Sequence, residues 1–327
     1  MRFREFTSGP TFRLLSSLLG GGLTIACILY FSFELHREFS SDNLNYNIPT
    51  TAVMLSGSAY LASYFCFAAS WQLLLKALHV TVPIRSNLGI HAVTQFAKYL
   101  PGNVAHHIGR LGLTAREGAP AGTVAAAMTL EILMVIGIMS LIGLPLIPQW
   151  LHMLSERSDA AWIVVASALV ACLIGSAMLY AYRWHPRVAG LRRHIGAQLP
   201  SVDTWNWQLV IMIAVLMGVG ANFAGATLVA LDTTSMLGSI QGYAYTISLY
   251  AVAFLLGFLM PGAPAGLGIR DMILLEGLSP LLGRDTSLQI TLYARLISAT
   301  CDLLVFILGI ALLRGRARTR PQINRDN

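Results

Sequence analysis

Two stretches of the sequence decide the fold: QFAKYLPGNVAHHIGR at Gln95–Arg110 and LGFLMPGAPAGLGIR at Leu256–Arg270. Each contains a Pro-Gly pair, and each ends on an arginine nine residues after its proline. Proline removes a backbone hydrogen-bond donor and glycine loosens the backbone, so neither stretch is typical of a continuous helix. We therefore predict a helix break in each. The break residues are Pro101 and Gly102 in the first stretch and Pro261 and Gly262 in the second.

The breaks lie within two apolar segments, 85–118 and 240–283, and six unbroken apolar runs accompany them. Each run has about 20 residues or more, enough to cross a hydrocarbon core of ~30 Å at 1.5 Å per residue. The predicted spans are 12–33, 51–75, 120–147, 161–182, 207–231 and 288–313. Of the 327 residues, 55% are hydrophobic and only 11% are charged, whereas soluble domains carry about 25% charged residues. This composition excludes soluble enzymes, nucleic-acid-binding proteins and disordered chains, and it predicts an all-α polytopic membrane protein.

The order of the segments indicates an internal repeat. Two spans, a broken segment and one span occur in 1–150, and the same order returns in 151–327, which ends in a basic tail. Three spans per repeat is an odd number, so the second copy is predicted to be inverted, with each broken segment forming a re-entrant helical hairpin. Inverted repeats with interrupted helices near the membrane midplane are typical of transporters. Two alternatives stay open: loops at the membrane surface, and segments that cross twice.

The basic residues predict an orientation. If both hairpins return to the side from which they enter, 17 of the 22 Lys and Arg residues lie on one side and 4 on the other. By the positive-inside rule the richer side, which holds both termini, is cytoplasmic. We expect a multi-pass protein of the bacterial inner membrane. We attribute its net charge of +7 to cytoplasmic loops near anionic lipids and not to nucleic-acid binding.

Three charged residues fall within predicted spans: Glu131, Arg295 and Asp302. A charge at the bilayer centre costs at least ~2.5–3.5 kcal/mol, so each needs a partner or a function. Glu131 and Arg295 each lie in the span after a hairpin, and we hypothesise that they pair across the repeat axis. Such a pair either holds the repeats together or lies beside a substrate path.

The hairpins hold the best candidates for ligand contact. Arginine presents a planar charged fork suited to phosphate, lysine adds a point charge, and a helix N-terminus after each break could direct backbone N–H groups at an anion. Alternatively, Arg110 reaches the membrane surface, and Arg270 pairs locally with Asp271 or Glu276. The predicted substrate-binding residues are Lys98, Asn103, Arg110, Gly262, Gly266, Gly268 and Arg270.

Enzymatic motifs are not found in the sequence: it has no GxSxG, no Walker loop and no metal-binding spacing. His106 and His107 are adjacent and do not share a helical face, so they are poor metal ligands, and either polar filling or a proton relay remains open for them. We expect no catalytic residues, no cofactor and no metal.

The motifs LPGNVAHHIGR (Leu100–Arg110) and MPGAPAGLGIRD (Met260–Asp271), with LYARLISATCDLL (Leu292–Leu304), resemble the lysylphosphatidylglycerol synthase membrane-domain family, also called flippase-like domain proteins. The resemblance covers about 12–313. It implies a membrane domain that moves or accommodates modified lipids. The sequence departs from the family at Ala265 and Asp271, where we expect a second glycine and a glutamate. It also lacks the soluble aminoacyl-transferase domain of bifunctional members, so we expect no lysyl-lipid synthesis.

We therefore expect a lipid flippase that moves an anionic or sugar- or amino-acid-modified lipid, such as a phospholipid or a polyprenyl-phosphate-linked headgroup. The alternatives are an integral-membrane glycosyl or phospho-group transferase, a non-catalytic membrane partner of one, and a scaffold that binds lipids without moving them. The expected partners are a lipid with a phosphate-bearing headgroup and enzymes of envelope-lipid or glycan biosynthesis, with no nucleic acid.

Overall fold

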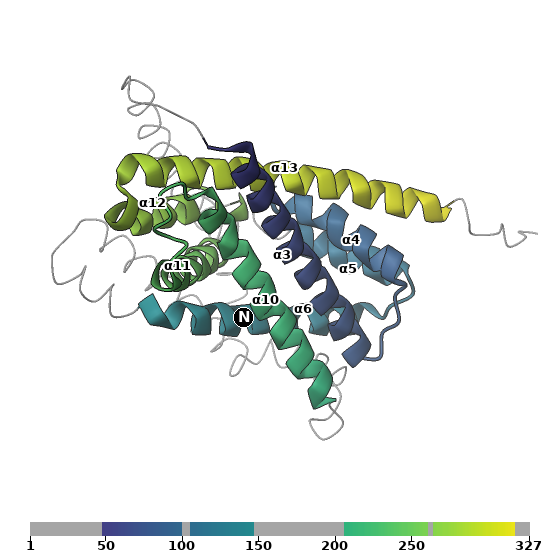
Figure 1. Ribbon diagram of the computed structural model, residues 1–327. Coiled ribbons are helices and arrows are strands. Elements are labelled where there is room, and N and C mark those ends of the chain that lie inside the picture. Colours follow the sequence, from purple (N-terminus) through teal and green to yellow (C-terminus); the bar gives the residue numbers. More distant parts are fainter. Residues whose placement is uncertain (1–47, 100–104, 147–205, 261–263, 318–327) are drawn as a thin grey trace, which may run out of the picture.

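The computed structural model describes residues 48–99, 105–146, 206–260 and 264–317, and the regular structure in these ranges is entirely helical (Figure 1). The α-helices are α3 (Thr50–Ala77), α4 (Ile84–Phe96), α5 (Ala105–Arg116), α6 (Ala121–Gly143), α10 (Trp207–Leu231), α11 (Ile240–Leu259), α12 (Ile269–Leu282) and α13 (Arg284–Ala317). Three short 3-10 turns accompany them: η1 (Ala97–Tyr99), η2 (Leu144–Leu146) and η4 (Pro264–Gly266).

Five of the described helices are long and apolar enough to cross a membrane: α3, α6 with η2, α10, α11 and α13. They confirm the predicted spans 51–75, 120–147, 207–231 and 288–313 as helices, with end points that differ by a few residues. The predicted spans 12–33 and 161–182 lie outside the described residues. The described part of the chain is therefore all-helical, and its apolar helices are those of a membrane protein, as the composition predicts.

In both broken segments the helix is interrupted where the sequence predicts. The first is α4, η1 and α5, and the second is α11, η4 and α12. With 13 and 12 residues, α4 and α5 each extend less than about 20 Å, too short to cross the ~30 Å core alone. The 20 residues of α11 are enough to cross it. The break residues themselves, Pro101, Gly102, Pro261 and Gly262, lie outside the described ranges, as does Asn103.

The packing of the helices is reciprocal between the two halves of the chain. The arm α4 of the first broken segment packs against α13 of the second half, while α11 packs against α6 of the first half. The helices α3 and α10 lie side by side along much of their length, at the front of Figure 1, and η1 contacts η4. Two apolar cores stabilise this arrangement. One contains residues from the four helices α10, α11, α12 and α13, and the other contains residues from α3, α6 and α10 around the fully buried Trp71. Each broken segment therefore rests on a helix of the opposite half.

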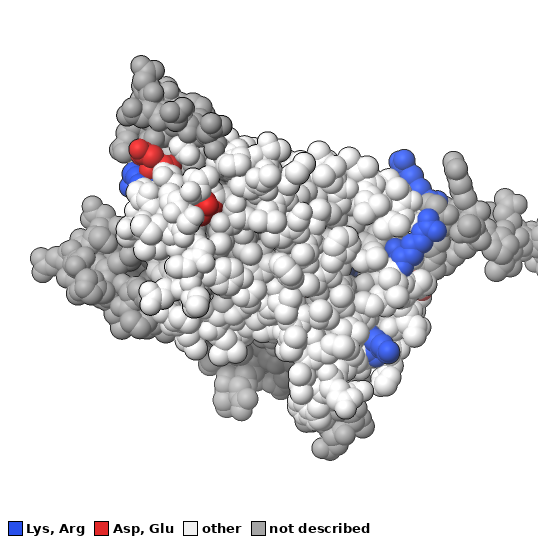
Figure 2. Space-filling view, in the orientation of Figure 1, with Lys and Arg blue, Asp and Glu red and all other residues white. Residues whose placement is uncertain are grey.

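The surface agrees with a membrane environment. Figure 2 shows Lys and Arg gathered at one end of the molecule, and acidic residues together with some basic atoms at the other end. The surface between the two ends carries no charged residues in this view. Large apolar side chains are exposed along the spans, including Leu133 on α6, Ile211 on α10 and Leu304 on α13. Lipid tails solvate such side chains without the cost that water would impose.

Glycine permits a close contact between α4 and α13. A Cβ added at Gly309 of α13 would lie 2.6 Å from the Cβ of Ala92 and 3.0 Å from the carbonyl oxygen of Gly89, both on α4. Since neither atom is the end of a flexible side chain, the helices would have to move apart.

Replacing Gly309 with alanine is accordingly expected to destabilise the protein by about 1–3 kcal/mol, the usual cost of overpacking. The matched control is Gly218→Ala on α10, where an added Cβ meets nothing within 4 Å and helix propensity favours alanine by up to about 1 kcal/mol. Thermal unfolding of the two variants in detergent measures the difference. Equal melting temperatures would contradict the close α4–α13 contact.

Candidate functional site

A cavity of about 190 Å³ lies between the two halves of the chain. Its wall takes residues from α3, α4, η1, α5 and α6 of the first half and from α10, α11, η4, α12 and α13 of the second. Six of the predicted residues line it: Lys98, Arg110, Glu131, Gly266, Arg270 and Arg295. Gly268 and Asp302 are buried close to it, whereas Asn103 and Gly262 lie outside the described residues. The described residues that the sequence singled out as ligand contacts and as charges within spans therefore converge on one site.

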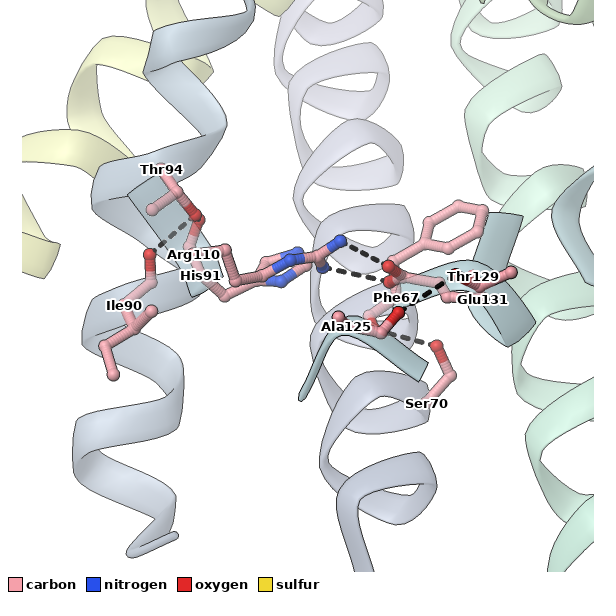
Figure 3. Close-up of polar contacts among 9 residues, drawn as sticks. All are labelled: Phe67, Ser70, Ile90, His91, Thr94, Arg110, Ala125, Thr129 and Glu131. Atoms are coloured by element: carbon pink, nitrogen blue, oxygen red, sulfur yellow. Dashed lines mark hydrogen bonds and ion pairs between the residues drawn. The ribbon is translucent and has the colours of Figure 1, made fainter. Parts of the chain in front are cut away.

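Arg110 and Glu131 form a bidentate ion pair. The two terminal nitrogens of Arg110 donate to the two carboxylate oxygens of Glu131, with Nη1 at 3.0 Å from Oε1 (Figure 3). The guanidinium also lies 4.2 Å from the ring centroid of Trp71, a cation–π contact. Arg110 and Glu131 are 6% and 7% exposed, so the pair is buried. The hypothesis that Glu131 pairs with Arg295 is therefore wrong: the partner of Glu131 lies within its own half.

Arg295 instead faces the start of α12. One of its terminal nitrogens lies 3.7 Å from an oxygen of Asp271, and the other donates to the carbonyl of Ala265 at 3.4 Å. The same Asp271 oxygen accepts from the backbone N–H of Gly268 at 3.1 Å. Gly268 has φ of 82°, a left-handed conformation that favours glycine, and this turn brings its N–H onto the carboxylate. The chain's own Asp271 thus takes the N–H that we predicted for an external anion.

Gly266 has a different role in the second break. Its φ is 67°, and its Cα lies 3.1 Å from the position that a Cβ on Gly257 of α11 would occupy. The two glycines therefore let the turn pack directly on the end of α11, as expected where backbone must approach closely. This contact fixes where α12 begins, and with it the position of Arg270.

Asp302 organises a third group of polar side chains. Its carboxylate accepts hydrogen bonds from the hydroxyls of Tyr60 at 2.8 Å and Tyr99 at 2.6 Å, and it pairs with the ammonium of Lys98 at 2.8 Å. Lys98 also donates to the Tyr60 hydroxyl at 3.2 Å. Since Lys98 and Tyr99 belong to η1, the group ties the first broken segment to α3 and α13.

Arg270 differs from the other three cations of the cavity. Within the described ranges no carboxylate lies within 4.0 Å of its nitrogens, and its buried Nε has no hydrogen-bond partner. Its guanidinium carbon lies 5.4 Å from the ring centroid of Tyr250. The predicted local pairs are wrong, because Asp271 contacts Arg295 and Glu276 pairs with Arg284 at 3.3 Å.

One wall of the cavity is aromatic. Tyr250, Phe254 and Phe258 recur every four residues on α11, and their rings stack with centroid distances of 6.4 and 6.0 Å. Opposite them, His106 and His107 line the cavity with ring centroids 3.7 Å apart. The cavity therefore offers a charged end at Arg270 and an apolar surface that runs along α11.

These features were compared with known proteins. A family model described as the lysylphosphatidylglycerol synthase TM region matches residues 15–309. The chain belongs to this family. No curated protein gives a significant match to the chain.

Membership in the lysylphosphatidylglycerol synthase TM region family confirms the resemblance drawn from the three motifs, and the match includes both broken segments and the last span. It places the site in a membrane domain associated with lipid-related processes.

Sequence reasoning missed several residues of this family member's site: Trp71, Tyr60, Tyr99 and Tyr250. These residues were not predicted because a tyrosine in an apolar segment is not distinctive by itself. The contact of Tyr60 with Asp302 also joins positions 242 residues apart, which the sequence does not reveal. The only local signal was a polar aromatic ring in the middle of a span, where a hydroxyl needs a partner.

Proposed function

We propose that this protein translocates a lipid with an anionic, phosphate-bearing headgroup between the two leaflets of the membrane. The observation that supports the proposal is the cavity between the two halves, in which Arg270 forms no ion pair with any described carboxylate. An unmatched cation inside a membrane domain is costly. A bound anion offsets that cost, and among membrane components phosphate-bearing headgroups supply it.

The path for such a lipid follows from an inverted-repeat architecture with two re-entrant hairpins. This architecture is supported by the reciprocal packing of α4 on α13 and of α11 on α6, and by the contact of η1 with η4. In transporters of this design the substrate site lies where the interrupted helices meet, and one repeat moves against the other to expose it to each side in turn. The headgroup would occupy the cavity while the acyl chains remain in the bilayer.

The orientation that we propose places both termini in the cytoplasm of a bacterial inner membrane. It is supported by the basic residues at the ends of α3, α4, α5 and α13, which are Lys76, Arg85, Arg116 and Arg314. A gathering of basic residues at one end of the molecule is visible in Figure 2. Positive charge concentrates on the cytoplasmic side of membrane proteins.

Lipid scrambling in proteoliposomes tests the function. Phosphatidylcholine vesicles with trace phosphatidylglycerol carrying an NBD acyl group lose about half their fluorescence to external dithionite, and the protein should extend that loss toward completion. Arg270→Gln should abolish the extension, because the headgroup loses its charged contact. The matched control is Arg284→Gln, which removes an arginine outside the cavity.

The outcomes separate the candidate functions. Full activity of Arg270→Gln, or no activity of the native protein with labelled phosphatidylglycerol or a labelled polyprenyl phosphate, would overturn the proposal. Formation of a new lipid species by the purified protein from a lipid-phosphate sugar donor would favour the transferase alternative instead.

A further inference from the structure

The cavity has more cations around it than carboxylates that pair with them. Four cations line it: Lys98, Arg110, Arg270 and Arg295. Three have a carboxylate of the chain beside them, since Lys98 pairs with Asp302, Arg110 with Glu131 and Arg295 with Asp271. Arg270 has none among the described residues. The described groups therefore leave the cavity one positive charge in excess.

The position of Arg270 makes that excess available to a ligand. Arg270 is the second residue of α12 and lines the cavity, with Tyr250 beside its guanidinium. Its neighbour Asp271 is 3% exposed, contacts Gly268 and Arg295, and forms no ion pair with Arg270. The Arg270 Nε is buried and lacks an acceptor among the described residues. A guanidinium with free donors is suited to a phosphate oxygen.

The charge balance of the cavity indicates which class of phosphate ester it binds. We propose that the cavity selects a phosphodiester headgroup with a single negative charge, held by Arg270. A phosphodiester ligand neutralises the excess of one charge, whereas a phosphomonoester carries about −1.5 to −2 near pH 7 and would leave unmatched negative charge in a low-dielectric site. A zwitterionic headgroup brings an ammonium, and the carboxylates of Glu131, Asp271 and Asp302 already have partners.

The aromatic wall indicates that the phosphodiester belongs to a lipid. Phe254 and Phe258 continue the row that starts at Tyr250 beside Arg270, so an apolar surface begins next to the charged contact. A water-soluble phosphodiester would leave that surface uncovered, whereas the glycerol and first methylene groups of a lipid would cover it. This inference rests on the proposed function, because its ligand is the lipid that the function moves.

Lipid binding to the purified, delipidated protein tests the inference apart from transport. Native mass spectrometry at pH 8 compares phosphatidylglycerol, phosphatidylethanolamine and phosphatidate, with glycerophosphoglycerol and inorganic phosphate as soluble competitors. We expect phosphatidylglycerol to bind at least about tenfold more tightly than the other two lipids, the equivalent of one charge-assisted hydrogen bond. The soluble competitors should displace it only weakly.

Three variants make the test specific. Arg270→Gln should lower affinity for phosphatidylglycerol about tenfold or more, and Arg284→Gln should leave it unchanged. Asp271→Asn releases a second cation, Arg295, while the amide can still accept from Gly268. This variant should bind phosphatidate more tightly than phosphatidylglycerol, a reversal that misfolding cannot produce.

Equal binding of phosphatidylethanolamine or phosphatidate by the native protein would overturn the inference. So would unchanged selectivity in folded Asp271→Asn, or full displacement by the soluble phosphodiester, which would assign the site to a soluble anion. Selective binding without scrambling would refute the proposed function alone, whereas scrambling without headgroup selectivity would refute only this inference.

Discussion

Replacing Glu131 with glutamine is expected to lower the free energy of unfolding by about 3–5 kcal/mol, the usual cost of breaking a buried ion pair from one side. The substitution leaves the Arg110 guanidinium, 6% exposed, without its counter-charge. The stacked ring of Trp71 attracts the cation but does not neutralise it. Chemical or thermal unfolding of the purified protein in detergent measures the loss.

The same pair offers two controls. The double variant Arg110→Met with Glu131→Leu removes both charges together, and it should be more stable than either single variant, because no unpaired charge remains. Glu276→Gln breaks the more exposed pair with Arg284, whose side chain is 35% exposed, and should cost less than about 1 kcal/mol. Equal losses in Glu131→Gln and Glu276→Gln would contradict the buried pair.

Replacing Asp302 with asparagine is expected to cost about 3 kcal/mol or more, since a neutral amide leaves the Lys98 ammonium without its carboxylate. The substitution should lower the stability of η1 locally as well as that of the whole protein. Lys98 and Tyr99 belong to η1, so hydrogen exchange at Ala97–Tyr99 should quicken relative to the spans. Global unfolding and exchange mass spectrometry together measure the effect.

Single hydroxyl deletions provide a graded comparison. Tyr99→Phe removes one hydrogen bond to the Asp302 carboxylate and should cost about 1.5–3 kcal/mol, whereas Tyr245→Phe removes a bond to the neutral carbonyl of Gly277 and should cost about 0.5–1.5 kcal/mol.

Unchanged hydrogen exchange at Ala97–Tyr99 in the Asp302→Asn variant would mean that the Asp302 carboxylate does not hold η1 in place.

The spans and the breaks were predictable because they depend on local chemistry. A run of about 20 apolar residues crosses a bilayer whatever surrounds it, and a Pro-Gly pair interrupts a helix on its own. The cavity's charged residues were predictable for related reasons. A charge within a span is costly anywhere in the protein, so Glu131 and Arg295 stand out without knowledge of their neighbours. Arg110 and Arg270 stand out because each ends a Pro-Gly segment and offers a fork suited to phosphate.

The pairing of those charges was not predictable. It depends on how each helix is rotated and shifted against the others, and that is set by contacts such as Trp71 under Arg110. The predicted repeat suggested a partner for Glu131 in the other half. In the structure α5 packs against α6, so Arg110 of the same half is the partner. Matching motifs therefore did not indicate which charges pair.

The exchange of packing partners between the halves also has a consequence for how the chain is made. α4 leaves the ribosome long before α13, the helix that covers it, has been synthesised. We expect a nascent chain to hold α4 and α5 in a provisional state, shielded by lipid or by the insertion machinery, until translation reaches the last helix. A stop codon placed just before α13 should therefore yield a product that quality-control proteases remove.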